Sequence, residues 1–150
     1  MQKIMLLLSA SLAVMGCSDS SADEAHESFA ELYAGASGTA TGDAILGVWG
    51  GGGANFDTRW VFRANTITLA NKCGADIVGV TVAAEVSSEA FRILASAEDA
   101  IGECGVKTKP RAFSKCPSEL GGLEDCFYIK GKTMTLYSGA DSLSLQKLRD

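Results

Sequence analysis

The residue types that most often carry catalytic chemistry are sparse in this sequence. Its only histidine, His26, lies in an acidic N-terminal stretch, so the rest of the chain offers no imidazole for a Ser-His-acid triad or a Cys-His pair. Glu98, Asp99 and Glu103 could form a carboxylate pair or a calcium loop, but the EF-hand spacing is absent and a solvated loop is the simpler interpretation. We therefore expect no catalytic residue, no metal and no cofactor. The expected protein is not an enzyme, and a carboxylate-based hydrolase is the enzymatic alternative.

Cys17 is a thiol in a distinctive setting near the N-terminus. It follows a charged start at Lys3 and a mostly apolar run over residues 4–15, and Gly16 lies directly before it. This is the layout of a secretory signal peptide, and the run is shorter than the roughly 20 residues that a membrane-spanning helix needs. The ending Val14-Met15-Gly16-Cys17 resembles the lipobox of bacterial lipoproteins.

The lipobox resemblance implies an address and an anchor. In that family the cysteine thiol, here that of Cys17, receives a diacylglycerol, the preceding residues 1–16 are removed, and the new N-terminus is acylated. The protein would then be exported and held at a membrane through this lipid. The residue after the cysteine is Ser18 rather than Asp, which resembles enteric lipoproteins of the outer membrane. In a Gram-negative source this implies the outer membrane, facing the periplasm or the cell surface.

The other four cysteines lie in the body of the chain, at Cys73, Cys104, Cys116 and Cys126. An even number of cysteines in an exported chain predicts two disulfides. A zinc site is the alternative, but it usually needs two closely spaced cysteine pairs, which these gaps do not supply. Three pairings are possible. We favour Cys104–Cys116, within one long connection, together with Cys73–Cys126, which would join two strands.

Composition divides the chain into three parts: residues 1–16 are the signal peptide, residues 17–43 an acidic tether, and residues 44–150 the folded domain. The tether holds six of the eighteen acids and no Lys or Arg, so the domain is close to neutral. This balance leaves no basic footprint for nucleic acid. The membrane contact would therefore be made by the lipid on Cys17.

One piece of the tether has a helical pattern. Residues 21–24 match a capping box, and Ala25, Phe29, Leu32 and Tyr33 recur at helical spacing. The pattern predicts a short helix over about residues 22–34, lying on the domain or frayed.

From residue 44 onward, apolar and polar residues alternate as they do in half-buried strands. Eight short strands are predicted, over residues 45–50, 58–63, 66–69, 78–86, 91–95, 126–130, 132–138 and 142–148. The glycine run 50–53 is interpreted as a hairpin loop, and residues 98–125 as one long connection. The expected fold is all-β, an eight-stranded antiparallel meander closed into a small barrel, because closure removes exposed strand edges. A β-sandwich is the alternative.

Gly47-Val48-Trp49 in the first strand resembles the G-x-W signature of the lipocalins and their calycin relatives, the avidins and small barrel protease inhibitors. In those families the Trp closes one end of the barrel, and a basic residue near the last strand packs across its ring. The resemblance therefore implies a lipocalin-like barrel plugged by Trp49, with Lys147 or Arg149 above the indole.

Trp60 is the second tryptophan of the chain. It alternates in phase with Thr58 and Phe62, so we expect all three side chains to point inward with Trp49 nearby. Trp60 is thus a candidate for the interior, either as a ligand contact or as part of the plug.

A wholly basic segment lies within the long connection and consists of Lys107, Lys109, Arg111 and Lys115. Acidic residues flank it on both sides, so it is either a solvated loop or a contact patch for an anionic partner. Lipid A, a cell-wall polymer or an acidic protein would carry the matching charge. A disulfide within this connection would hold the charges in a fixed array and lower the entropic cost of binding.

Together these patterns predict a non-enzymatic lipoprotein of the cell envelope whose small barrel binds a small apolar ligand or an envelope protein. An inhibitor of a protease or lysozyme in the periplasm is one alternative, and a purely structural envelope protein is another. An interior pocket of roughly 300 Å³ or more would favour a small ligand. An interior filled by Val78, Val80, Val82, Leu136 and Leu145 would favour protein contact or a structural role.

Overall fold

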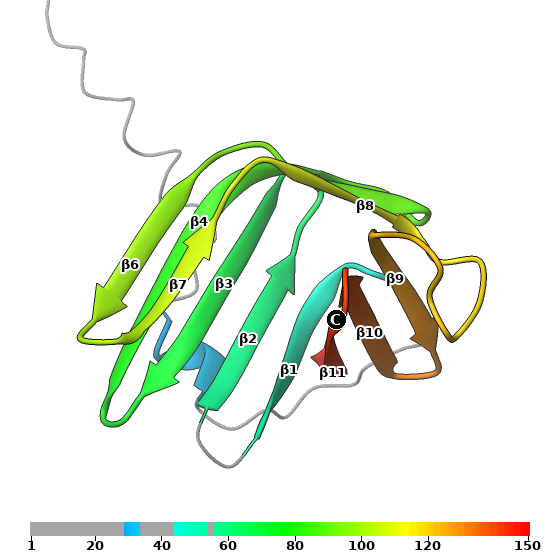
Figure 1. The fold of residues 1–150 in the computed structure, drawn as a ribbon. Helices are drawn as coiled ribbons and strands as arrows, with labels where there is room; N and C mark the ends of the chain where they lie inside the picture. Colours follow the sequence, from blue (N-terminus) through cyan, green and yellow to red (C-terminus); the bar gives the residue numbers. More distant parts are fainter. Residues whose placement is uncertain (1–28, 34–43, 54–55) are drawn as a thin grey trace, which may run out of the picture.

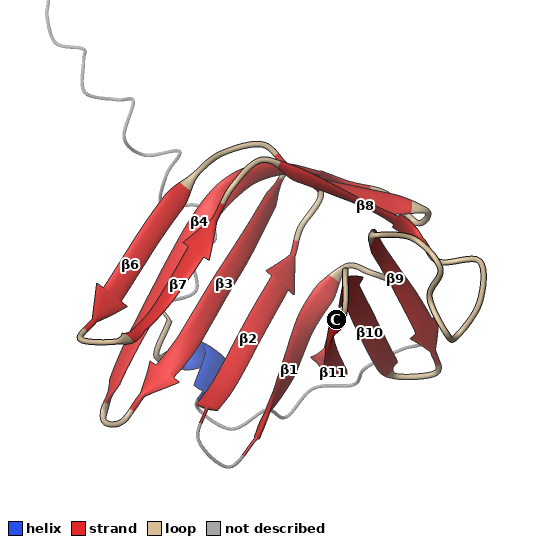
Figure 2. Cartoon of the chain, viewed as in Figure 1, coloured by secondary structure: helices blue, strands red, loops and turns tan. Residues whose placement is uncertain are grey.

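The computed structural model describes residues 29–33, 44–53 and 56–150 of this chain, which are almost entirely β-strand (Figures 1 and 2). The strands are β1 (Gly47–Gly53), β2 (Phe56–Phe62), β3 (Thr66–Cys73), β4 (Asp76–Val86), β5 (Ala90–Ile93), β6 (Ala97–Ile101), β7 (Cys104–Thr108), β8 (Arg111–Lys115), β9 (Asp125–Lys130), β10 (Thr133–Ser138) and β11 (Asp141–Arg149). A 3-10 turn, η2 (Glu31–Tyr33), lies against them. The predicted all-β class is confirmed. Among the described residues, no helix is long and apolar enough to cross a membrane.

Nine of the strands close into a barrel in the order β1-β11-β10-β9-β8-β5-β4-β3-β2. The closed barrel is therefore confirmed over the sandwich, but the eight-stranded antiparallel meander is corrected by one strand. An odd number of strands cannot close with every neighbour antiparallel, so one pair must be parallel. That pair is β8 and β9, joined by Ser114 opposite Cys126 and Lys115 opposite Phe127.

The extra strand comes from the segment that was predicted to be one long connection. Residues 98–125 contain most of β6 and all of β7 and β8, of which β8 enters the barrel, while β6 and β7 form a separate hairpin. The hairpin lies beside β4 and β3 in Figure 1. Asn71 Nδ2 donates to the Gly105 carbonyl over 2.8 Å, and the Gly79 amide donates to Asp99 Oδ2 over 2.9 Å. These contacts hold the hairpin to the barrel strands.

The glycine run also belongs to a strand rather than to a loop, because β1 extends through Gly53. A Cβ placed on Gly51 would lie 2.5 Å from the Ser144 carbonyl oxygen of β11. A side chain does not fit at that distance. Glycine therefore lets β1 approach β11 closely enough to close the barrel.

The main core fills the barrel interior, as strand alternation requires. Its aromatic centre is formed by Phe62, Phe91, Phe113 and Phe127, with ring centroids of Phe91 4.8 Å from Phe113 and 5.0 Å from Phe62. The five residues expected to fill the interior are all buried: Val78, Val80, Val82, Leu136 and Leu145. Thr58 and Phe62 are buried and Trp60 packs against the same core, so the predicted inward face of this strand is confirmed.

Two disulfides are present, as predicted, but the favoured pairing was wrong. Cys73 pairs with Cys104, and Cys116 pairs with Cys126, with Cα–Cα distances of 5.8 and 5.0 Å. The reason lies in the missed strands. Hairpin β6–β7 brings Cys104 to the end of β3, while the parallel pairing of β8 with β9 brings Cys116 to Cys126.

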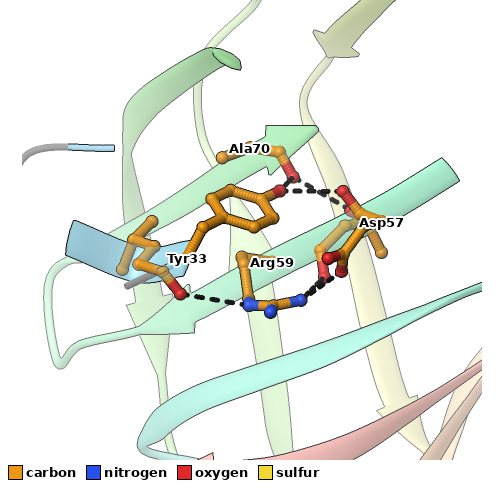
Figure 3. Close-up of polar contacts among 6 residues, drawn as sticks. Tyr33, Asp57, Arg59 and Ala70 are labelled. Atoms are coloured by element: carbon orange, nitrogen blue, oxygen red, sulfur yellow. Dashed lines mark hydrogen bonds and ion pairs between the residues drawn. The ribbon is translucent and has the colours of Figure 1, made fainter. Parts of the chain in front are cut away.

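A second, smaller core lies where residues 29–33 meet β2 and β3. Figure 3 shows the polar contacts beside this core. The Tyr33 hydroxyl lies 2.8 Å from the Asp57 carbonyl oxygen and 2.9 Å from that of Ala70, and donates its proton to this pair. Arg59 Nε donates to the Leu32 carbonyl over 3.2 Å, and the Arg59 guanidinium lies 4.5 Å from the centre of the Tyr33 ring. We call this arrangement the tether contact.

The tether contact bears on the helix predicted over residues 22–34. Of this range the structure describes residues 29–33, in which only η2 (Glu31–Tyr33) is helical, and residues 22–28 and 34 lie outside the described residues. Leu32 is buried and Tyr33 half-buried against the domain. Burial raises the pKa of Tyr33 from 10.0 to about 12, despite the opposing effect of the nearby Arg59.

Candidate functional site

Trp49 of β1 lies opposite Lys147 of β11 on one side and opposite Trp60 of β2 on the other. Trp49 has no exposed surface, and its indole Nε1 donates to the Ile45 carbonyl over 2.8 Å. Lys147 Nζ lies 5.7 Å from the centre of the indole ring, donates to the Ala44 carbonyl over 3.0 Å and pairs with Asp150 over 3.0 Å. The Lys147 side chain is itself fully buried. The base above the indole is therefore Lys147.

Gly47 explains how a lysine can reach this position. Its φ is +130°, and a Cβ there would lie 2.5 Å from the Arg149 carbonyl oxygen and 3.0 Å from Lys147 Cε. Glycine is thus required both by the backbone conformation and by the space that Lys147 occupies. Arg149, the other predicted partner of Trp49, lies opposite Val48 and is half-buried.

Two adjoining pockets lie in the barrel on the side of the β10–β11 turn. Lys147 lies toward the other end of these strands, where its backbone amide donates to the Lys132 carbonyl just before β10. The larger, of about 360 Å³, is lined by Trp60, Leu69, Ile93, Lys107, Thr108, Lys109, Arg111 and Phe113. The smaller, of about 180 Å³, is lined by Trp60, Arg111, Phe113, Leu136, Ser138, Asp141, Ser142 and Leu143. We call the two together the mouth pocket. Three residues line both parts: Trp60, Arg111 and Phe113.

Arg111 is the best-anchored charge of the mouth pocket. Its Nη2 donates to Asp125 Oδ1 over 2.6 Å and also to the Ser138 hydroxyl, while its guanidinium lies 4.8 Å from the centre of the Phe113 ring. The hydrogen bond from Arg111 lowers the pKa of Asp125 below its ordinary value. The carboxylate is therefore ionised at neutral pH and holds the guanidinium in place.

The fold brings together several of the predicted site residues. Trp60 and three members of the basic segment, Lys107, Lys109 and Arg111, line the same pocket. The segment is therefore ordered strand and corner rather than one long loop, and its three lysines are exposed to solvent. Its fourth member, Lys115, points elsewhere and lies 3.8 Å from Glu89.

Among the residues of the larger pocket that were not predicted as site residues are its apolar walls Leu69, Ile93 and Phe113. Leu69 and Ile93 were assigned to strands, but as generic core. Phe113 is the inward residue of β8, and the alternation Arg111, Phe113, Lys115 is too short and too charged to suggest a strand. Cys17, the predicted lipidation site, lies outside the described residues.

Two further grooves lie on the surface of the described residues. A surface groove of about 320 Å³ lies along β4, β5 and β8, and another of about 270 Å³ borders the acidic side of hairpin β6–β7. Within the described ranges, no group of three or more His, Cys, Asp or Glu side chains is placed to hold a metal ion. No family model, no curated protein and no solved structure matches this chain.

Proposed function

We propose that this protein is an exported, lipid-anchored β-barrel of the cell envelope that binds a small apolar ligand without catalysing a reaction. The observation that carries the proposal is the larger part of the mouth pocket, about 360 Å³, with Trp60, Leu69, Ile93 and Phe113 among its walls. This volume exceeds the roughly 300 Å³ at which small-molecule sites begin. Ligand binding would gain from burying these apolar walls.

The contact between Trp49 and Lys147 supports a lipocalin-like interpretation, in which these two residues form the closed end of the barrel. The predicted arrangement was a tryptophan plug in the first strand with a base from the last strand above it. Trp49 and Lys147 have this arrangement, and Gly47 makes room for it. A barrel with one end closed and a pocket toward the other is suited to holding a ligand.

The ligand proposal is tested with a neutral apolar fluorophore such as N-phenyl-1-naphthylamine. We expect the chain starting at Ser18 to bind it, and Trp60→Ser to weaken binding about tenfold by removing a wall of both pockets. Leu46→Ser is the matched control, because Leu46 is 47% exposed and lines neither pocket. Absence of binding to the parent chain, or equal weakening by both variants, would overturn the proposal.

The lipid anchor is a separate part of the proposal and has its own test. Because Cys17 alone would carry the lipid, Cys17→Ser should abolish palmitate labelling and either release or mis-process the protein. Membrane fractionation with labelled palmitate measures both effects. A labelled Cys17→Ser protein in the membrane fraction would rule out the anchor while leaving the pocket untouched.

A second candidate function, an inhibitor that contacts a protein, is favoured by the loop between β8 and β9. Leu120 in this loop is 90% exposed, and Cys116–Cys126 closes the loop. The Tyr137 hydroxyl donates to the Glu119 carbonyl, and Lys130 Nζ donates to Glu119 Oε1 over 3.0 Å. An exposed leucine beside a fixed backbone is suited to insertion into a partner. Leu120→Ser would then abolish inhibition of a periplasmic protease or lysozyme and leave fluorophore binding unchanged.

A further inference from the structure

The polar side chains that carry charge in the larger part of the mouth pocket are all basic. Lys107, Lys109 and Arg111 line it together with its apolar walls, and no acidic residue lines it. A purely apolar ligand would leave these three charges without a role in binding. We infer that the ligand is a single-chain amphiphile whose oxyanion head group, a carboxylate or a phosphate, contacts these bases while its chain lies in the barrel. The inference rests on the proposed function, because it names the ligand class of the same pocket.

The corner between β7 and β8 brings the three bases to one pocket. Lys107 lies in β7, Lys109 in the corner and Arg111 at the start of β8. Lys107 is on the exposed face of β7, while Arg111 is in phase with the buried Phe113 of β8. The Thr108 hydroxyl donates to the Ala95 carbonyl over 3.2 Å and, with Pro110 next to Lys109, fixes the corner between the two strands.

The existing partners of these bases leave them able to bind an anion. Lys107 lies 3.8 Å from Glu98, and both side chains are more than 60% exposed, so this pair is weak. Within the part of the chain that the structure describes, no ion pair joins Lys109 to an acid. Arg111 directs Nη2 to Asp125 and Ser138, which leaves Nε and Nη1 on the other edges of the guanidinium.

The position of Asp141 indicates which way the head group and the chain of the ligand point in the mouth pocket. Asp141 lines the smaller part, beside Leu136 and Leu143, while the larger part holds the bases. A head group near Asp141 would be repelled, so it lies at Lys107 and Lys109. The chain then extends past Trp60 toward the two leucines.

The test uses the chain from Ser18 to Asp150. Every residue of both core clusters and both disulfides lies within it, so it retains the whole described fold. Displacement of the neutral fluorophore is measured with four probes of one chain length: decanoate, decyl phosphate, 1-decanol and decyltrimethylammonium. The key variant is Lys107→Gln/Lys109→Gln. Its matched control is Lys72→Gln/Lys132→Gln, since these lysines are exposed and line neither pocket.

We expect decanoate, decyl phosphate or both to bind about tenfold or more tightly than 1-decanol, with the cationic probe weakest. The Lys107→Gln/Lys109→Gln variant should remove most of this advantage and leave 1-decanol binding within about twofold, whereas the control should change neither. Added salt should weaken the anions and not the alcohol. Binding by one anion alone would identify the head group as carboxylate or phosphate.

Two results would overturn the inference, and they are distinguishable. Equal binding of decanoate, decyl phosphate and 1-decanol, unchanged in the lysine variant, would reject an anionic ligand while the proposed pocket function stands. Failure of every probe and of the fluorophore to bind would reject the proposed function itself. Circular dichroism of each variant confirms that the fold is retained.

Discussion

A fully buried lysine side chain is costly unless partners replace the water around its ammonium group. Lys147 has such partners in the Ala44 carbonyl, the Asp150 carboxylate and the face of the Trp49 ring. These contacts join the chain before β1 to the end of β11. Lys147 therefore links the two ends of the barrel sequence by hydrogen bonds and an ion pair, in addition to packing against Trp49.

We expect Lys147→Ala to lower the free energy of unfolding by about 2–4 kcal/mol, because the Ala44 carbonyl loses its donor and the Trp49 ring loses contact. Denaturant unfolding followed by circular dichroism measures the loss. Lys132→Ala serves as the control, since that side chain is exposed and should change stability by less than about 0.5 kcal/mol. Equal effects of the two variants would show that the plug contributes nothing.

Phe62 and Trp60 lie on one face of β2 but differ in burial, which gives a second prediction. Phe62 has no exposed surface, so Phe62→Ala should cost about 3–5 kcal/mol of stability. Trp60 borders the mouth pocket and is only partly buried, so Trp60→Ala should cost less, about 1–3 kcal/mol. The same unfolding assay compares them. A loss below about 1 kcal/mol for both would place this face in solvent and contradict the observed register.

Sequence reasoning found the residues of the closed end more easily than those of the pocket. Trp49 was named together with Lys147 or Arg149, because a three-residue motif and a base near the C-terminus resemble a known pattern, and of the two bases Lys147 lies above the indole. Phe113 was missed because its role depends on β8 entering the barrel, a tertiary pairing with β5 that no local pattern indicates. A residue whose function comes from such a pairing is not visible in one sequence.

At the scale of elements, strands were predicted wherever apolar residues alternate over several positions. Strand β4, with five buried residues, and β10 are examples. Strands β6, β7 and β8 were all missed. β6 has no buried residue, β7 has only Val106 and Thr108, and β8 has only Phe113. Their pairing is supplied by the rest of the sheet and by the disulfides, so tertiary context decides their conformation.

The two disulfides should contribute unequally to stability. Cys73–Cys104 closes the longer loop, with a sequence separation of 31 against 10 for Cys116–Cys126. In the chain-entropy model the first contributes about 4 kcal/mol and the second about 3 kcal/mol. Unfolding of Cys73→Ala/Cys104→Ala and of Cys116→Ala/Cys126→Ala compares them, and non-reducing peptide mapping verifies the pairing. Recovery of a Cys104–Cys116 peptide would contradict the observed hairpin position.

The tether contact should be sensitive to alkaline pH. Tyr33 is neutral in the folded protein, with a pKa raised to about 12. A raised pKa favours folding fully below the unfolded value of about 10, and this contribution is lost as the pH rises from about 10 to 12. Stability at pH 11 relative to pH 8 should fall more for the parent than for Tyr33→Phe, which cannot ionise. Equal losses would show that Tyr33 titrates as an exposed tyrosine.

At the scale of the whole molecule, the proposed lipocalin-like barrel has two chemically different ends. In that proposal Trp49 and Lys147 close one end, and the mouth pocket, bordered by Arg111 and Asp141, lies toward the other. The tether contact adds a constraint on position. Under the proposed lipidation, the chain from Cys17 to Phe29 spans at most about 40 Å, so the barrel lies near the membrane.

The central claim is that the ligand enters at Trp60 and not at Trp49, and the two tryptophans of the chain make this directly measurable. In an NMR spectrum of the nitrogen-15-labelled chain from Ser18, each indole N–H gives its own signal, assigned with Trp60→Phe. On titration with 1-decanol, the Trp60 signal should shift progressively and saturate. The Trp49 signal should shift less, even though Trp49 lies opposite Trp60 in the sheet, because Trp49 lines neither pocket and its N–H is bonded to the Ile45 carbonyl. A larger shift of the Trp49 signal than of the Trp60 signal, or no shift of either, would contradict the account.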